Sequence, residues 1–365
     1  MKIALVINNY MIGGGLINLY RLVKALPNIE FALFAKEGKG KFLFRDIKNI
    51  KLFNNYNYKN ILNFKPDIIH FNDLKSLINF LFYDRIYKKN TVPLLFTAHG
   101  LHIHKYEFSK KLLDKFKFYM RFLIEKFAYS KVSKVIAVSK EDQNWLITNY
   151  KLKNVVYIPN GIDCKEVFLD NKTKLDEKYI NKLKNKFIFF TIARFHFQKG
   201  YDILVKAIRI VNKKLPSNIV FVFLGDGPDK EKILKMIKKY ELDNRIVLIN
   251  ERVSNSFLWN LGHVFLLPSR WEGLPTVVLE AGCYKKLVIA SSTYGIRELI
   301  QHNKTGLLFP VEDENALAET ILKAYKDFNK LSKLGNNLHK LVISEYTIEK
   351  MAKRYENLYM QFVKN

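Results

Sequence analysis

The amino-acid sequence predicts an α/β protein made of two doubly wound, Rossmann-like domains. Short apolar runs alternate with longer helix-like stretches throughout the chain, and a polar stretch divides these runs into two series. Most runs are rich in β-branched or aromatic residues, which is typical of strands in parallel sheets covered on both faces. At 365 residues, the chain fits two domains of about 150–200 residues each.

The candidate strands can be given in chain order. The first series comprises residues 2–7, 31–34, 68–71, 94–97, 134–138 and 155–158. The second series comprises residues 187–193, 219–224, 246–249, 264–267, 287–290 and 306–309. Helix-like segments lie between many of these runs, which predicts βα units and two parallel sheets.

A polar stretch at residues 171–186, rich in Lys, Asn and Asp, marks the domain boundary. We expect an N-terminal domain over residues 1–165 and a C-terminal domain over residues 166–345. Thr347 is suited to cap a last amphipathic helix, and we expect this helix (residues 346–365) to pack back on the N-terminal domain. Doubly wound sheets bind ligands beyond the carboxyl ends of their strands, so the expected site is a cleft between the domains.

Composition limits the class of protein. No apolar run approaches the ~20 residues that span a bilayer, and the first run is too short for a signal peptide. The only cysteines, Cys164 and Cys283, offer no disulfide framework and no tetrahedral metal site, so we expect a reducing cytoplasm. The net charge of +27 favours polyanionic partners, although a coding bias toward Lys, Asn and Ile explains it equally well.

The most informative stretch is Pro268-Ser-Arg-Trp-Glu-Gly-Leu-Pro275, which continues to Glu280. A strand ends at Pro268, and a helix begins near Pro275, a residue suited to the first helical position. Backbone N–H groups at the start of a helix lack intrahelical partners and bind anions. Glu272 and Glu280 are roughly 10 Å apart along the backbone, whereas a glycosidase pair is separated by about 5 Å or about 6.5–9.5 Å. The two carboxylates therefore suit two ends of one ligand, or else are an ordinary loop residue and a helix-surface residue.

This stretch resembles the Glu-x7-Glu signature of the family-4 retaining glycosyltransferases, which have the GT-B fold. The resemblance implies that Glu272 contacts the donor sugar and that Glu280 binds the ribose hydroxyls of the nucleotide. The amides of the intervening loop and helix start would face the diphosphate or the sugar. These donor-binding residues are Gly273, Leu274 and Thr276.

Further segments of the second domain support the resemblance. Arg194 and Lys199 follow its first strand, where two cations can neutralise a diphosphate, and the resemblance implies that they hold the pyrophosphate. In a chain with 61 basic residues, the alternative is an incidental pair. Gly225 belongs to a Gly-Asp-Gly-Pro segment that resembles the loop beside the nucleotide and is also an ordinary turn sequence. Arg252 and Val253 fall where the family places backbone contacts to the base.

In the first domain, a glycine run and a histidine follow predicted strands. Gly13 and Gly14 belong to a triple-glycine run that allows close approach to a phosphate, and the run resembles an element that lies against the donor phosphates. The family often has an acidic residue where this chain has Leu16. A lone histidine is more often structural, but Thr-Ala-His-Gly around His99 resembles an element that faces the transferred sugar.

The stretch at residues 108–129 is both basic and aromatic. Six apolar residues recur there at helical spacing, interleaved with lysines: Phe108, Leu112, Phe116, Tyr119, Leu123 and Phe127. Such a helix docks on anionic lipid or packs on a core with its lysine face in solvent.

Together, these features predict a glycosyltransferase of the hexosyltransferase class. It would move a hexose or N-acetylhexosamine, with retention, from a nucleotide-diphosphate sugar to a glycan or lipid-linked acceptor in bacterial surface polysaccharide or glycoconjugate synthesis. We expect a cytoplasmic enzyme, with peripheral contact to an anionic membrane as an open option. We expect no cofactor and no metal, because the nearest Asp-x-Asp match, residues 312–314, lacks a supporting ligand. Two alternatives are a sugar-nucleotide epimerase of GT-B architecture and a non-catalytic basic protein that binds membrane surfaces; no motif favours nucleic acid.

Overall fold

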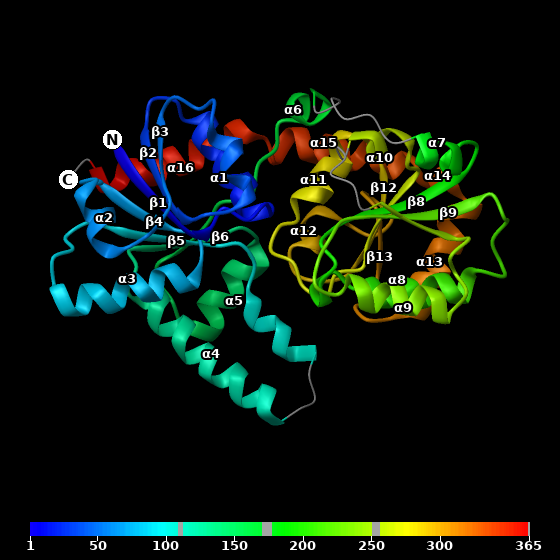
Figure 1. The fold of residues 1–365 in the computed structure, drawn as a ribbon, viewed down its shortest axis with the longest axis horizontal. Coiled ribbons are helices and arrows are strands. Elements are labelled where there is room, and N and C mark those ends of the chain that lie inside the picture. Colours follow the sequence, from blue (N-terminus) through cyan, green and yellow to red (C-terminus); the bar gives the residue numbers. More distant parts are fainter. Residues whose placement is uncertain (109–111, 170–176, 250–255, 364–365) are drawn as a thin grey trace. The chain divides into compact units, whose positions relative to one another are not determined.

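The computed structural model has two compact units (Figure 1). It describes residues 1–108, 112–169, 177–249 and 256–363. Unit 1 comprises Met1–Gly161 and Tyr346–Asn365, and unit 2 comprises Ile162–Glu345. Unit 2 therefore begins four residues before the boundary expected from the sequence, at residue 162 instead of 166. None of the described helices is both long and apolar enough to cross a membrane.

Unit 1 contains one parallel sheet, whose described strands have the order β3-β2-β1-β4-β5-β6-β7. These strands are β1 (Lys2–Asn9), β2 (Glu30–Lys36), β3 (Ile50–Phe53), β4 (Ile68–Phe71), β5 (Leu94–Ala98), β6 (Lys134–Ala137) and β7 (Val155–Tyr157). The chain builds outward from β1 on one side and then continues on the other from β4. β1 and β4 are adjacent in the sheet, so the order of the strands reverses between them.

Helices cover both faces of this sheet. They are α1 (Gly14–Ala25), η1 (Lys39–Phe44), α2 (Tyr58–Asn63), α3 (Leu74–Tyr87), η2 (His102–Phe108), α4 (Leu112–Ser130), α5 (Lys140–Tyr150) and α16 (Ile348–Val363). Along β1, Ile3 and Leu5 pack in one core with α1 and α16, whereas Ala4 and Val6 belong to the other core, with α3 and α5. Successive strand residues face opposite sides, so a strand buried on both faces is apolar throughout.

Strand β3 was not predicted from the sequence. It is a four-residue strand, Ile50–Phe53, that pairs only with β2, at the edge of the described sheet. Its sequence, Ile-Lys-Leu-Phe, lies in a stretch rich in Lys and Asn. An edge strand needs less apolar surface than a central one, so its pattern is weak.

Unit 2 contains a second parallel sheet, whose described strands have the order β10-β9-β8-β11-β12-β13. These strands are β8 (Phe187–Ile192), β9 (Ile219–Leu224), β10 (Ile246–Ile249), β11 (Val264–Leu267), β12 (Leu287–Ser291) and β13 (Leu307–Phe309). The helical elements of this unit are α6 (Cys164–Leu169), α7 (Glu177–Leu183), η3 (Phe197–Lys199), α8 (Tyr201–Val211), α9 (Lys230–Lys239), α10 (Ser256–Leu261), α11 (Thr276–Cys283), α12 (Ile296–Leu299), α13 (Glu314–Lys326), α14 (Phe328–Leu331) and α15 (Lys333–Glu345). Here the strand order reverses between β8 and β11, which are adjacent.

The last described helix, α16, belongs to unit 1 although unit 2 precedes it in the chain. The Thr347 hydroxyl accepts a hydrogen bond from the Lys350 amide at 3.3 Å, so Thr347 caps the helix. Met351, Tyr355 and Tyr359 are buried on its inner face. Figure 1 shows the helix beside α1, against which it packs.

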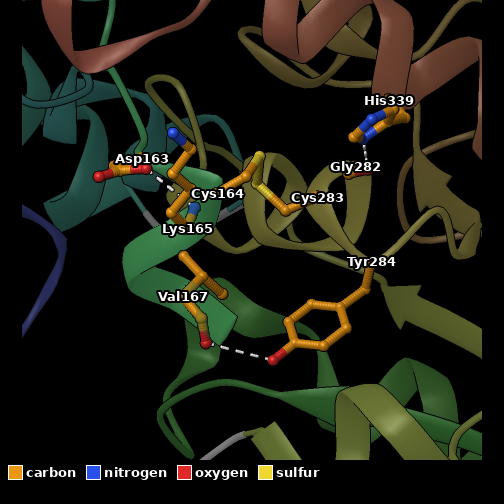
Figure 2. The surroundings of a disulfide bond; sticks show 8 residues. All are labelled: Asp163, Cys164, Lys165, Val167, Gly282, Cys283, Tyr284 and His339. Atoms are coloured by element: carbon orange, nitrogen blue, oxygen red, sulfur yellow. Dashed lines mark hydrogen bonds between the residues drawn. A yellow bond between two sulfur atoms is a disulfide. The ribbon is translucent and has the colours of Figure 1, made fainter. Parts of the chain in front are cut away.

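A disulfide joins Cys164, at the start of α6, to Cys283, at the end of α11 (Figure 2). The expectation that the only two cysteines, Cys164 and Cys283, provide no disulfide framework was therefore wrong. The fold packs α6 against α11 and brings the two Cα atoms to 5.2 Å, a distance that suits a disulfide. Beside the disulfide, the Tyr284 hydroxyl donates a hydrogen bond to the Val167 carbonyl at 3.2 Å.

Candidate active site

Both sheets place polar residues at the point where the strand order reverses. In unit 2, the loops after β8 and β11 leave adjacent strands at their carboxyl ends. In unit 1, the segments after β1 and β4 do the same. Ligands of open α/β sheets bind in this position, and most of the residues selected from the sequence lie in these loops or in those of neighbouring strands.

The centre of the unit 2 site is Glu272, in the loop after β11. Its Oε1 atom accepts hydrogen bonds from Lys199 Nζ at 2.5 Å and from Ser269 Oγ at 2.6 Å. The side chain of Glu272 is buried, whereas that of Lys199 is 20% exposed. A buried carboxylate is stable only when it is paired, and Lys199 provides this pairing while part of its side chain stays accessible. Two residues chosen 73 positions apart in sequence are thus in direct contact.

Further hydrogen bonds hold the two loops together. Gln198 Nε2 donates to the Trp271 carbonyl at 2.8 Å, and the Arg270 amide donates to the Gln198 carbonyl at 2.7 Å. From the end of β12, the Ser291 hydroxyl donates to the Ser269 carbonyl. The backbone that precedes Glu272 is therefore fixed by hydrogen bonds to neighbouring strands and loops.

Arg270 is a buried cation that the sequence analysis did not select. Its guanidinium donates to both carboxylate oxygens of Asp202, at 3.0 and 2.9 Å, and to Glu312 at 2.7 Å. It also donates to the Phe197 carbonyl at 2.6 Å and lies 3.8 Å from the centroid of the Phe197 ring. Burial acts to raise the pKa of Asp202, but the hydrogen bonds and charge of Arg270 outweigh it and lower that pKa. Arg270 holds η3, and with it Lys199, against the loop after β11.

Two glycines allow backbone segments of this site to approach each other closely. Gly295 has φ of +68°, and a Cβ atom there would lie 1.3 Å from the Gly273 carbonyl oxygen. Gly225 has φ of +156°, and its Cβ atom would lie 2.0 Å from the Ala193 carbonyl oxygen, next to Arg194. Only glycine fits at either position, so Gly225 has a structural reason in addition to its predicted role beside the nucleotide.

The remaining residues selected in this unit lie near Glu272 in the chain, in the loop after β8, or outside the described residues. Gly273 and Leu274 are buried, and Thr276 and Glu280 are half-buried on α11, which starts at Thr276. Arg194 is exposed in the loop after β8. The predicted contacts to the base fall on Arg252 and Val253, which lie outside the described residues.

In unit 1, His99 lies just after β5 and contacts Asn72, which follows β4. His99 Nε2 is 3.1 Å from Asn72 Oδ1, and because Oδ1 can only accept, Nε2 carries the proton. Nδ1 then has a lone pair, is buried, and has no hydrogen-bond partner among the described residues. Burial, with a smaller contribution from His102, lowers the pKa of His99 to about 4. At neutral pH, His99 is therefore an uncharged hydrogen-bond acceptor.

The glycine run lies next to this histidine. A Cβ atom at Gly15 would lie 3.4 Å from His99 Cδ2. Gly13 has extended backbone and precedes the first residue of α1, Gly14, and both glycines are exposed. The uncapped amino end of α1 and the imidazole ring thus form one polar edge of the unit 1 sheet.

A buried polar network lies behind His99 and was also missed from the sequence. His70, on β4, contacts the Tyr359 hydroxyl through Nδ1 at 2.8 Å and the Thr97 hydroxyl through Nε2 at 2.7 Å. Thr97 also contacts the Tyr355 hydroxyl at 3.2 Å. Burial lowers the pKa of His70 to about 3. The network connects β4 and β5, whose ends carry Asn72 and His99, to α16; a polar residue within the apolar run Ile-Ile-His-Phe was its sequence signal.

Residues 312–314 are the nearest match to an Asp-x-Asp motif, and each of their carboxylates has a partner within the protein. Glu312 pairs with Arg270, and Glu314 lies 3.3 Å from Lys206. Asp313 caps α13 by accepting hydrogen bonds from two backbone amides. In the part of the chain that the structure describes, no cluster of three or more His, Cys, Asp or Glu residues could hold a metal ion.

Two parallel α/β units, each with polar loops at its switch point, define the GT-B class of glycosyltransferase, and comparisons with known proteins agree. A family described as "Glycosyl transferases group 1" matches residues 172–341, and "Glycosyltransferase Family 4" matches residues 27–166. The chain belongs to the family-4 glycosyltransferases.

Several characterised proteins are similar over most of their length. The capsular polysaccharide biosynthesis glycosyltransferase CapM of Staphylococcus aureus is 25% identical over 340 residues, which cover 87% of this chain and 89% of CapM. An Escherichia coli UDP-Gal:alpha-D-GlcNAc-diphosphoundecaprenol alpha-1,3-galactosyltransferase is 26% identical over 317 residues, covering 84% of this chain and 79% of that enzyme. Anabaena Alr3699/HepE, solved with UDP and glucose, superposes with a TM-score of 0.81 at 19% identity and covers 99% of this chain and 100% of its own.

Proposed function

We propose that this glycosyltransferase moves a hexose or N-acetylhexosamine from a nucleotide-diphosphate sugar to a glycan or lipid-linked acceptor, with retention and without a metal. The observation that carries the proposal is the contact of Lys199 with the buried Glu272 at the switch point of unit 2. It joins a cation suited to a diphosphate with a carboxylate suited to sugar hydroxyls. A UDP donor is supported by the similar Anabaena structure that holds UDP and glucose.

The chemical demand is the negative charge that grows on the departing diphosphate. Arg194 is exposed after β8, and Lys199 lies in η3 of the same βα connection, so both can approach one anion. The first amides of α11 add donors without a side-chain cap to compete with them. A single preorganised donor of this kind is typically worth about 3 kcal/mol in the transition state.

Glu272 and His99 would interact with sugar hydroxyls rather than supply charge to the leaving group. Glu272 is ion-paired to Lys199. The hydrogen bonds from Lys199 and Ser269 both go to its Oε1 oxygen, so Oε2 is the oxygen that we propose to accept from a sugar hydroxyl. His99 is neutral and presents a lone pair at Nδ1. Because no protein nucleophile is identified among the selected residues, we propose attack by the acceptor on the face that the diphosphate leaves.

The direct test is a thermal-shift panel of nucleotide sugars followed by transfer assays with lipid-linked and free glycan acceptors. We expect one nucleotide sugar to stabilise the protein and Glu280→Ala to weaken that stabilisation. Wild-type donor binding by Glu280→Ala would contradict the assigned ribose contact. Conversion of the donor sugar in the absence of acceptor would instead favour the epimerase alternative.

Contact with an anionic membrane is a second part of the proposal, and helix α4 supports it. Of the six apolar residues that the sequence placed on one helical face, five are exposed: Leu112, Phe116, Tyr119, Leu123 and Phe127. The inner face of α4 instead carries Ala128 and Tyr129, which belong to the core. The alternative, in which the six-residue face packs on the core, is therefore wrong for these five residues. One similar enzyme is named for an acceptor carried on diphosphoundecaprenol, and an acceptor on such a lipid would lie at a membrane.

A further inference from the structure

A cavity of about 680 Å³ lies in unit 1 between α3, α4 and the carboxyl end of β5. Sites for small organic ligands have volumes of about 300–1,000 Å³. Much of the lining is apolar and comes from all three elements: Ile78, Phe96, Phe116, Met120 and Ile124. The cavity is thus large enough for an organic ligand and presents it with apolar surface.

The same cavity reaches the polar edge of the sheet. Asn72, His99 and Gly100 also line it, and His99 has the neutral imidazole with an unpartnered Nδ1 described above. A ligand in the cavity would therefore extend from the residue that we propose to face the transferred sugar. This geometry fits an acceptor better than a structural lipid.

On its other side, the cavity continues into the exposed surface of α4. Phe116, Met120 and Ile124 line the cavity and are also 62%, 42% and 43% exposed. Exposed apolar side chains on α3, including Phe82 and Ile86, enlarge this surface. Soluble monomers rarely expose contiguous apolar patches of this kind unless the patch binds a protein or a membrane.

The charge around the cavity favours an anionic ligand. Lys75, Lys117 and Arg121 line it. Glu125 accepts hydrogen bonds from Arg121 at 2.5 Å and from the Tyr150 hydroxyl at 2.8 Å, so Arg121 is already paired, and Asp73 caps α3. Lys117 is exposed and pairs with the half-buried Asp114 at 3.3 Å, an ion pair that contributes little. Lys75 and Lys117 are therefore the cations that an anionic ligand would meet.

An apolar chain beside an anionic group is the chemistry of a lipid phosphate. We propose that the cavity between α3 and α4 binds the first part of the hydrocarbon chain, and the attached phosphate, of a lipid-phosphate-linked acceptor. The remainder of the chain would follow the exposed face of α4 into the bilayer. This inference rests on the proposed function and narrows its acceptor from a glycan or a lipid-linked sugar to the lipid-linked class.

The test uses farnesyl phosphate as the probe, with its binding measured by calorimetry on the full chain. Ile124→Trp fills the cavity, whereas Leu123→Trp is a matched control, because Leu123 is the adjacent residue, equally exposed, and does not line the cavity. An indole ring in the cavity takes the space that the probe needs, so we expect Ile124→Trp to weaken binding about tenfold or more, which is about 1.4 kcal/mol or more. Leu123→Trp should bind the probe as the wild type does, and farnesol should bind more weakly than farnesyl phosphate.

Nucleotide-sugar binding by the same variants separates this inference from the proposed function. No binding of farnesyl phosphate, or equal weakening by both substitutions, overturns the inference even when the nucleotide sugar still binds. If farnesyl phosphate binds and only Ile124→Trp weakens that binding, the cavity assignment is supported. This holds even if the protein binds no nucleotide sugar, a result that would overturn the proposed function. Equal affinity for farnesol and farnesyl phosphate overturns the phosphate part of the assignment.

Discussion

The two units have the same kind of sheet but different sites. In unit 2, Lys199 pairs with Glu272, Arg270 pairs with Asp202 and Glu312, and a disulfide fixes the end of α11. In unit 1, the polar edge at His99 borders a cavity that continues into exposed apolar surface. We propose that the first site is preorganised for a small anion and that the second is open toward a large amphipathic partner. Equivalent folds can therefore serve a constant donor and a variable acceptor through their loops and one helix.

The largest expected effect is on the rate of turnover, and it follows from removing a positive charge from the unit 2 site. Arg194→Ala should reduce the rate of sugar transfer about 10²–10³-fold, because it removes a donor to the departing diphosphate. The exposed side chain of Arg194 predicts unchanged thermal unfolding. Arg209→Ala, another exposed arginine of unit 2 that stacks on Tyr240, is the control and should leave the rate unchanged. Equal rates for the two variants would remove Arg194 from the site.

The second prediction concerns the rigidity of unit 2. Arg270→Ala should lower the free energy of unfolding by about 3 kcal/mol, because it leaves Asp202 and Glu312 without their buried partner. Urea denaturation measures this effect. Lys206→Ala removes an exposed contact with Glu314 at 3.3 Å and should cost less than about 1 kcal/mol. A similar small cost for Arg270→Ala would mean that the loops of unit 2 are not held by this cation.

The third prediction tests the buried histidines of unit 1. The pKa of His70 is lowered to about 3 and that of His99 to about 4. At a pH below the ordinary pKa of histidine, the unfolded chain therefore binds more protons than the folded chain. The contribution of these two neutral histidines to the free energy of unfolding should therefore be fully present above about pH 6.5 and decrease as the pH falls toward 4. Thermal unfolding between pH 7 and pH 5 measures the slope, and His70→Gln should reduce it. An unchanged slope in that variant would show that His70 is not buried as a neutral ring.

The smallest expected effect concerns the surface of α4. Tyr119→Glu adds a negative charge to an exposed apolar position and should reduce co-sedimentation with anionic vesicles severalfold, because both apolar contact and charge attraction weaken. Ile343→Glu, at an exposed apolar position on α15 of unit 2, is the control. If both variants sediment like the wild type, the exposed face of α4 does not contact the bilayer.

The sequence predicts the fold class well because most strands are buried on both faces. The GT-B class is confirmed by the similar structures, and α16 begins directly after Thr347, the residue expected to cap it. Strand β3 was not predicted because it is only four residues long and lies in a stretch rich in Lys and Asn. The disulfide was not predicted because Cys164 and Cys283 come together only through the packing of α6 against α11, which no local sequence pattern encodes.

The candidate site could be predicted only in part, for a related reason. Glu272 and Lys199 were selected because motifs mark residues that contact ligands, and the structure brings these two together. Arg270 lies in the same motif as Glu272, and Asn72 follows β4, but their importance comes from partners distant in sequence, Asp202 and His99. The roles assigned to individual donor-binding residues remain predictions that the variants above test.

Helix α16 has a consequence for how the protein is made. Strand β1 is translated before unit 2, yet its core residues Ile3 and Leu5 are covered by Met351, Tyr355 and Tyr359, which are translated about 350 residues later. Unit 2 can therefore complete its core while unit 1 still lacks one covering helix. During that interval the nascent chain exposes an apolar sheet face, and a chaperone that binds it should associate until translation reaches α16.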